Sequence, residues 1–342
     1  MNSSGGINRI IFDDIRYCLD SYGINQFAQT EIKKFLCTSP DDYLKRQLYA
    51  KESIKYILHS HGKSQLSEEI AILGEIEEHL IPIQDKLRDH VIHTLLTFLF
   101  GIYLIEKLEL NDKITPFEWK LTSLLHDIAY PYEIAFYLTK KIEKHINSMA
   151  IDRHINIPML KSSNTIINLE KLTRSPSSIG LLTQRFNKWG FKFSAGSLYR
   201  KMKSEYNVDH GIVSSMIVLK AMDILYSHHN PRRILKYTPR DGNDWNYENF
   251  ENQIVNSCAS IFIHNLPKEL FITKKIDKMM HTLPFVLRLS DELQDWERIT
   301  KDNFYFPGEL YSISITNSTI IFCVPPSRLD QIKSSLDCFD SC

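Results

Sequence analysis

The sequence predicts an all-α protein, and two observations carry that prediction. Glycine is scarce, with 12 residues in 342, where average usage is about 7%. Between the glycines, apolar residues recur at intervals of three and four, the spacing that forms one face of a helix. With 43% hydrophobic and 24% charged residues, the chain has a globular composition, and it is long enough to bury a core without disulfides or metals.

Residues 1–80 predict a helical N-terminal segment. Amphipathic stretches at Ile15–Leu19 and Tyr43–Leu58 are separated by turn signals at Ser39-Pro40 and His61-Gly62. No pattern that indicates chemistry occurs in this segment.

The most apolar part of the chain, residues 87–105, predicts a buried central helix. Apolar side chains occupy all sides of its helical projection, which is typical of a helix in the middle of a core. The run Val91–Ile105 is too short to cross a bilayer and contains His93. We therefore expect no association with a membrane.

A second core helix is predicted to begin with the sequence Thr115–Glu118. Its threonine suits the N-cap, its proline suits the first turn, and its glutamate is spaced for a capping box. The apolar residues that continue the helical spacing are Leu121, Leu124, Leu125 and Ile128. We expect Pro131 to end this helix, which places His126 and Asp127 near its C-terminal end.

Apolar helices are also predicted later in the chain. One runs from Gly211 to Tyr226 with Asp209 as N-cap, one covers about residues 252–264, and one covers residues 282–296.

The end of the chain predicts a small ββα tail. Two strands, Tyr311–Ile315 and Thr319–Val324, flank a turn at Asn317-Ser318, and a helix follows. The sequence thus divides into three expected parts: a helical N-terminal segment (1–80), a helical domain (81–300) and the ββα tail (301–342).

Between about residues 145 and 208 the helical pattern weakens, and we expect an insertion of loops and short helices. Basic side chains without an acidic one follow from Lys171 to Ser204: Lys171, Arg174, Arg185, Lys188, Lys192, Arg200, Lys201 and Lys203. The aromatic residues among them are Phe186, Trp189, Phe191, Phe193 and Tyr199. This composition suits contacts with phosphates and bases, and the alternative is a solvated surface. The candidate substrate-binding residues are Arg185, Lys188, Arg200 and Lys201.

The overall charge excludes one class of protein. The chain has 41 basic and 41 acidic side chains, which argues against a surface built as a whole for nucleic acid. Its six cysteines show no Cys-x-x-Cys pair and no zinc-type spacing, and residues 1–11 do not resemble a signal peptide. We expect a cytoplasmic protein with reduced thiols.

Each predicted core helix carries residues able to bind a metal: His93, His126, Asp127, His210, His264 and Asp291. A buried ionisable side chain is costly unless it is paired or bound to a metal. The alternative for each histidine is a structural role, either bonded to a backbone carbonyl or placed at a helix end.

Together these segments resemble the HD-domain metal-dependent phosphohydrolase superfamily, whose pattern is a histidine, a His-Asp pair and a distant aspartate, all on helices. The resemblance covers about residues 80–298 and rests on Asp89–Thr94, Leu124–Ile128, Asp209–Gly211, Ile261–Asn265 and Leu287–Trp296. The chain departs from some members in its basic insertion and in having no double histidine at the position where some two-metal members have one. The resemblance implies an HD-type helical bundle in residues 81–300.

The resemblance also implies a metal site. The implied ligands of the principal metal are His93, His126, Asp127 and Asp291, and the extra histidines of two-metal members correspond to His210 and His264. Asp127, His210 and His264 are the candidate catalytic residues. Imidazoles with carboxylates suit manganese, iron, cobalt, nickel or zinc better than magnesium. One or two such ions with an open position would activate water.

We therefore expect hydrolysis of a phosphoester or phosphoanhydride bond in a small phosphorylated substrate such as a nucleotide. Two alternatives stay open. One is a nuclease that uses the basic aromatic stretch to bind single-stranded nucleic acid, and the other is a non-catalytic module that senses a nucleotide. The sequence sets no oligomeric state.

Overall fold

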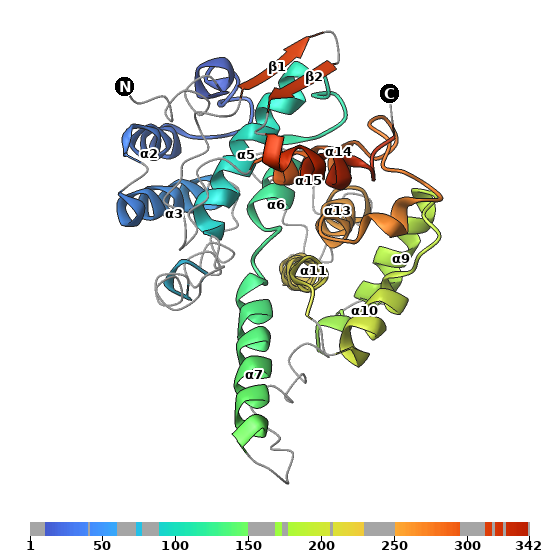
Figure 1. The fold of residues 1–342 in the computed structure, drawn as a ribbon. Helices are drawn as coiled ribbons and strands as arrows, with labels where there is room; N and C mark the ends of the chain where they lie inside the picture. Colours follow the sequence, from blue (N-terminus) through green and yellow to red (C-terminus); the bar gives the residue numbers. More distant parts are fainter. Residues whose placement is uncertain are drawn as a thin grey trace.

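The computed structural model describes residues 11–39, 42–59, 73–76, 89–149, 168–172, 177–205, 208–228, 250–294, 312–316, 319–323 and 326–340. Helices are the main secondary structure in this part of the chain, so the predicted all-α class is confirmed there. Figure 1 shows most of them gathered around α5, α6 and α13, with α7 projecting from the body.

Two helices of the N-terminal segment pack against each other. Helix α2, Gln26–Cys37, begins at the N-cap Asn25, whose side chain accepts a hydrogen bond from the Ala28 N–H at 2.9 Å. Helix α3, Tyr43–His59, contacts both α2 and the central helix α5. The N-terminal segment thereby covers one side of the core.

The central helix is α5, His90–Lys107, and its side chains from His90 to Ile105 are all buried. It begins at Asp89, whose carboxylate accepts a hydrogen bond from the Ile92 N–H at 2.9 Å. By length and hydropathy alone α5 would be able to cross a membrane, but 89% of that window is buried inside the protein. It is therefore the core helix that its apolar composition predicts.

Helix α6, Pro116–Leu124, begins as predicted and ends earlier than predicted. Both hydrogen bonds of the capping box at Thr115 are present. The helix ends at Leu124, so His126 and Asp127 lie in the turns before α7, Tyr130–Met149. The prediction that Pro131 ends α6 is wrong. Proline lacks an N–H and fits the first turn of a helix, which is where Pro131 lies in α7.

The later core helices surround α13, Asn256–His264. Helix α11, His210–His228, begins after Asp209, which accepts a hydrogen bond from the Ile212 N–H at 2.9 Å. A π-helical turn, Phe250–Val255, precedes α13, where the sequence predicts one regular helix. Helix α14, Thr282–Leu293, packs against α13 and α5.

The basic insertion contains η2, Asn168–Glu170, and two short helices, α9, Ser178–Lys188, and α10, Ala195–Ser204. Its aromatic rings are mostly inside the protein, with Phe186, Trp189, Phe191 and Tyr199 buried and Phe193 packed against the core. The prediction that these rings suit contacts with bases is therefore wrong for the buried ones. They supply the apolar surface that holds α9 and α10 on the domain.

The C-terminal residues form a hairpin and a helix. Strands β1, Ser312–Thr316, and β2, Thr319–Cys323, pair antiparallel, with Ser314 opposite Ile321. The expected turn at Asn317-Ser318 lies outside the described residues. Helix α15, Pro326–Leu336, packs against α14.

Gly101 in α5 allows the close approach of α6. A Cβ atom at this position would overlap the indole of Trp119, which is fully buried and donates a hydrogen bond to the Phe98 carbonyl at 3.1 Å. Gly101→Ala should gain about 0.5–1 kcal/mol of helix propensity but lose about 1–3 kcal/mol to overpacking. Urea unfolding should therefore show a net destabilisation. Gly74→Ala is the control, since its Cβ would meet nothing closer than 3.4 Å, and equal stability of both variants would contradict the packing described.

His281 connects the insertion to the start of α14 and should make stability depend on pH. Its Nδ1 accepts a hydrogen bond from the Asp277 N–H at 2.9 Å, and its Nε2–H donates to the Trp189 carbonyl at 2.8 Å. Burial lowers the pKa of His281, and the bond to Trp189 opposes this only in part. Because the folded-state pKa is below the unfolded value of about 6.5, the stability from His281 is present above that pH and is lost as the pH falls through the folded-state pKa.

The corresponding measurement is the unfolding free energy of wild type and His281→Ala from about pH 8 to pH 5. The stability difference between them should shrink as the pH falls. A stability difference that stays constant across this pH range would contradict a neutral His281 ring in the folded protein.

Candidate metal centre

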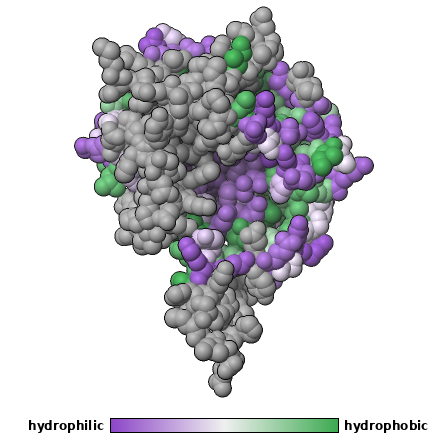
Figure 2. All heavy atoms as spheres, in the orientation of Figure 1, coloured by the Kyte–Doolittle hydropathy of each residue, from purple (hydrophilic) through white to green (hydrophobic). Residues whose placement is uncertain are grey.

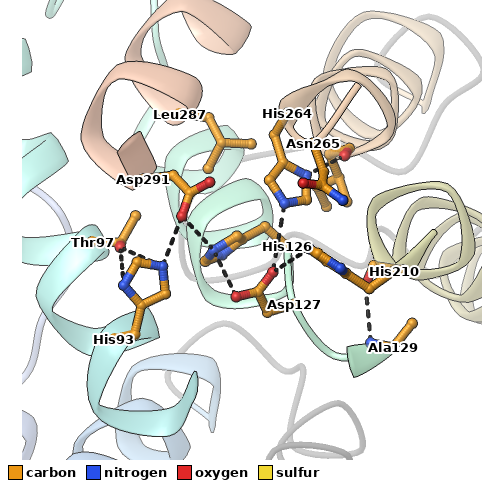
Figure 3. A network of polar contacts seen from close by, with 12 residues as sticks. His93, Thr97, His126, Asp127, Ala129, His210, His264, Asn265, Leu287 and Asp291 are labelled. Atoms are coloured by element: carbon orange, nitrogen blue, oxygen red, sulfur yellow. Dashed lines mark hydrogen bonds and ion pairs between the residues drawn. The ribbon is translucent and has the colours of Figure 1, made fainter. Parts of the chain in front are cut away.

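The six histidines and aspartates predicted from the sequence come together at one place. They come from α5, the turns between α6 and α7, the start of α11, the end of α13 and the last turn of α14 (Figure 3). Figure 2 shows hydrophilic residues gathered in a recess at the middle of one face, where Figure 1 draws α11 along its axis.

One group of ligand atoms surrounds Asp291. His93 Nε2 lies 2.7 Å from Asp291 Oδ1, and His126 Nε2 lies 3.7 Å from the same oxygen. His126 Nε2 is also 3.3 Å from Asp127 Oδ2. His93 and His126 are buried, whereas the Asp291 side chain is 21% exposed.

A second group lies on the other oxygen of Asp127. His210 Nε2 is 3.3 Å and His264 Nε2 is 3.5 Å from Asp127 Oδ1. The carboxylate of Asp127 therefore faces one group of imidazoles with each of its oxygens (Figure 3). Such a carboxylate is suited to bridge two cations.

Hydrogen bonds on the far side of the rings fix which nitrogen faces the carboxylates. His126 Nδ1 donates to the Ser123 carbonyl at 2.7 Å, and His264 Nδ1 donates to the Ile261 carbonyl at 2.6 Å. Since a carbonyl only accepts, these Nδ1 atoms carry the protons. In the neutral rings, both Nε2 lone pairs point toward carboxylate oxygens.

The remaining two rings are held in the same sense. His210 Nδ1 donates to Glu133 Oε2 at 2.5 Å, and His93 Nδ1 contacts Gln294 Oε1. Such outer contacts are typical of metal-binding histidines, because they set the tautomer and the orientation of the ring.

This arrangement requires a cation between the nitrogens and the oxygens. Among the described residues, His126 Nε2 and Asp127 Oδ1 are buried and have no hydrogen-bond partner, and lone pairs that face carboxylates repel them unless a proton or a metal ion intervenes. Burial lowers the pKa of His126, but Asp127 and Asp291 outweigh burial and raise it to about 10. Burial raises the pKa of Asp127, but the imidazoles hold it well below its usual range.

The spacing also fits metal binding. Two ligand atoms that each lie about 2.1 Å from one ion are about 3.0 Å apart at a right angle and about 3.4 Å apart at the tetrahedral angle. The separations of 3.3–3.7 Å from His126, His210 and His264 to the two carboxylates are close to these values. His93 Nε2 lies nearer, 2.7 Å from Asp291 Oδ1, which is the distance of a direct hydrogen bond. Three sets of residues are thus able to hold a metal: His93, His126 and Asp127; His126, His264 and Asp291; Asp127, His210 and His264.

Three of the four basic residues predicted to bind substrate contact Glu251 or Glu205. Arg185 donates to the Glu251 carbonyl at 2.6 Å, and Lys188 pairs with the Glu251 carboxylate. Lys201 Nζ lies 3.9 Å from Glu205, and Arg200 is exposed on α10. Glu251 follows the basic stretch by many residues, so the sequence around these bases does not reveal it.

Sequence reasoning missed the residues that orient the ligands. Glu133 and Gln294 contact ligand imidazoles, and Ser214 accepts a hydrogen bond from the Ala129 N–H at 3.0 Å beside Asp127. Gln294 follows Asp291 by one helical turn's spacing, which is a usable signal. Glu133 and Ser214 act across elements and leave no signal in local spacing.

Comparisons with known proteins leave the family open. No family model, no curated protein and no solved structure matches the chain. The site therefore has to be interpreted from its own chemistry.

Gly211 makes room for the imidazole of His264. A Cβ atom at Gly211 would lie 3.0 Å from His264 Cε1 and 3.1 Å from its Nδ1. Gly211→Ala should displace the ring from Asp127 and weaken metal binding at the His210 and His264 group by roughly tenfold or more, as for a lost orienting contact. Gly196→Ala on α10 is the control, and isothermal titration of chelator-treated protein with Mn²⁺ is the measurement. Identical affinities in both variants would contradict the role given to Gly211.

Proposed function

We propose that the chain is a metal-dependent phosphohydrolase of the HD type, which uses metal-activated water to hydrolyse a nucleotide or a related phosphoester. The observation that carries the proposal is the convergence of four imidazole Nε2 atoms on the carboxylates of Asp127 and Asp291. A purely structural role for these histidines would not require all four Nε2 atoms to face the same two anions.

The residues of the cluster would provide two metal positions. His93, His126, Asp127 and Asp291 would hold the principal metal, and Asp127, His210 and His264 would hold a second. Nitrogen and oxygen donors together favour manganese, iron, cobalt, nickel or zinc over magnesium. When bound, such an ion lowers the pKa of water toward neutrality and neutralises charge on phosphoryl oxygens. The protein itself holds the Asp127 carboxylate between the two groups of imidazoles, so that each oxygen faces one group.

The substrate is proposed to be small, anionic and present in the cytoplasm. The resemblance of the histidine and aspartate pattern to the HD superfamily suggests the reaction class, and the exposed bases Arg200 and Lys201 would attract phosphate. Arg185 and Lys188 are assigned a lesser part in substrate binding, because Glu251 already contacts both. In this proposal residues 81–300 form the catalytic domain, flanked by the N-terminal segment and the C-terminal tail.

The metal site is tested directly by elemental analysis of purified protein. Wild type should retain a transition metal, and Asp127→Asn should lose most of it, because the amide removes the negative charge between the two groups and one of the two donor oxygens. Asp14→Asn, which alters only an exposed pair with Lys107, should retain it. Equal metal content in wild type and Asp127→Asn would overturn the site.

Activity is tested by phosphate release from nucleotides, cyclic nucleotides and short oligonucleotides. Wild type should hydrolyse one of the mononucleotide substrates, and Asp127→Asn should be slower by roughly 10²-fold or more, as expected when electrostatic assistance is removed. Cleavage of oligonucleotides alone would favour a nuclease. Bound metal and bound nucleotide without turnover would favour a sensor.

The basic residues are tested by charge reversal. Arg200→Glu with Lys201→Glu should raise the Michaelis constant more than it lowers the turnover number, because contacts far from the reacting bond stabilise ground and transition states alike. Lys45→Glu with Lys55→Glu on α3 is the matched control, since both lysines are exposed. Unchanged kinetics in the variant with Arg200 and Lys201 reversed would show that these two residues face solvent and do not bind substrate.

A further inference from the structure

Glu133 contacts His210 in two ways. It lies in the first turn of α7, and its Oε2 accepts a hydrogen bond from the His210 backbone N–H at 3.1 Å and from the ring Nδ1–H at 2.5 Å. One carboxylate oxygen thereby holds the backbone and the side chain of the same residue. The negative charge also lies at the N-terminus of α11, where the helix dipole favours it.

His210 needs a partner from another element because of its position in its helix. His126 and His264 each donate to the carbonyl of the residue three positions earlier, within their own turn. His210 is the first residue of α11, so no preceding turn of that helix offers a carbonyl to its ring. Among the described rings of the cluster, His210 is the one whose Nδ1 faces a carboxylate.

The geometry points to Glu133 as a positioning residue that sets the tautomer and the orientation of His210, and through it controls the second metal position on Asp127 Oδ1. This inference rests on the proposed metal centre and adds a residue that the ligand pattern does not contain. The Glu133 contact acts together with the Ala129 N–H bond to Ser214 at 3.0 Å. Both hydrogen bonds involve residues that follow Asp127 in the sequence, and both hold this segment against α11.

The effect of Glu133 should be confined to one side of Asp127. His210 and His264 face Oδ1, whereas His126 faces Oδ2 and His93 contacts Asp291. A loss of the Glu133 carboxylate frees the His210 ring to turn, and the alternative tautomer then presents a protonated Nε2 to the metal position. The group around Asp291 keeps all of its own orienting contacts.

The test is isothermal titration of chelator-treated full-length protein with Mn²⁺. Wild type should bind two ions, and Glu133→Ala should bind one of them roughly 10–100-fold more weakly, the usual effect of losing an orienting contact, while the other changes less than about twofold. Glu133→Gln keeps an accepting oxygen and should restore part of the affinity. Glu251→Ala, which removes a carboxylate that contacts Lys188, should bind both ions as wild type does.

A second comparison separates positioning from general damage to the fold. In a His210→Ala background, Glu133→Ala should have no further effect, because Glu133 acts through His210. Equal weakening of both ions, an equal effect in the His210→Ala background, or affinities identical to wild type would each overturn the inference while leaving the proposed function standing. A wild-type protein that binds a single ion overturns the inference alone, and one that binds no Mn²⁺ overturns both.

Discussion

The negative charges of Asp127 and Asp291 must be neutralised inside the protein, and the rest of the site depends on this constraint. Two carboxylates lie a few ångströms from the Nε2 atoms of four imidazoles, and most of these groups are buried. Such a cluster is stable only with positive charge inside it, carried by protons or by metal ions. The two carboxylates raise the pKa of His126 to about 10, because they stabilise positive charge on its ring.

The surrounding helices supply rigidity to this cluster. Trp119 packs against Gly101 and fixes α6 on α5, which bears His93. Arg288, buried in α14, donates to the carbonyls of Ile263 and Leu266 at 3.2 and 2.9 Å and so holds the end of α13 on either side of His264. The ligands on α5, α13 and α14 therefore come from elements whose positions are set by contacts outside the cluster, which is what a preorganised site requires.

Much of the fold follows from local patterns, because capping and apolar periodicity act within a few residues. The capping box at Thr115 and the buried helix from His90 to Lys107 are examples. The end of α6 could not be predicted in this way, since a buried turn needs apolar residues such as Ile128 as much as a helix does. The roles of Glu133 and Glu251 depend on tertiary contacts. The ligand residues could be predicted from their types among apolar neighbours together with the resemblance of their pattern to the HD superfamily.

The most direct test of the metal centre is anomalous diffraction from crystals grown with Mn²⁺ or Zn²⁺, recorded at the absorption edge of the metal. The proposed metal centre predicts two peaks that share Asp127, one beside the Nε2 atoms of His93 and His126 and one beside those of His210 and His264. Density confined to other parts of the molecule, or no anomalous peak at Asp127 with the metal in excess, would contradict the account.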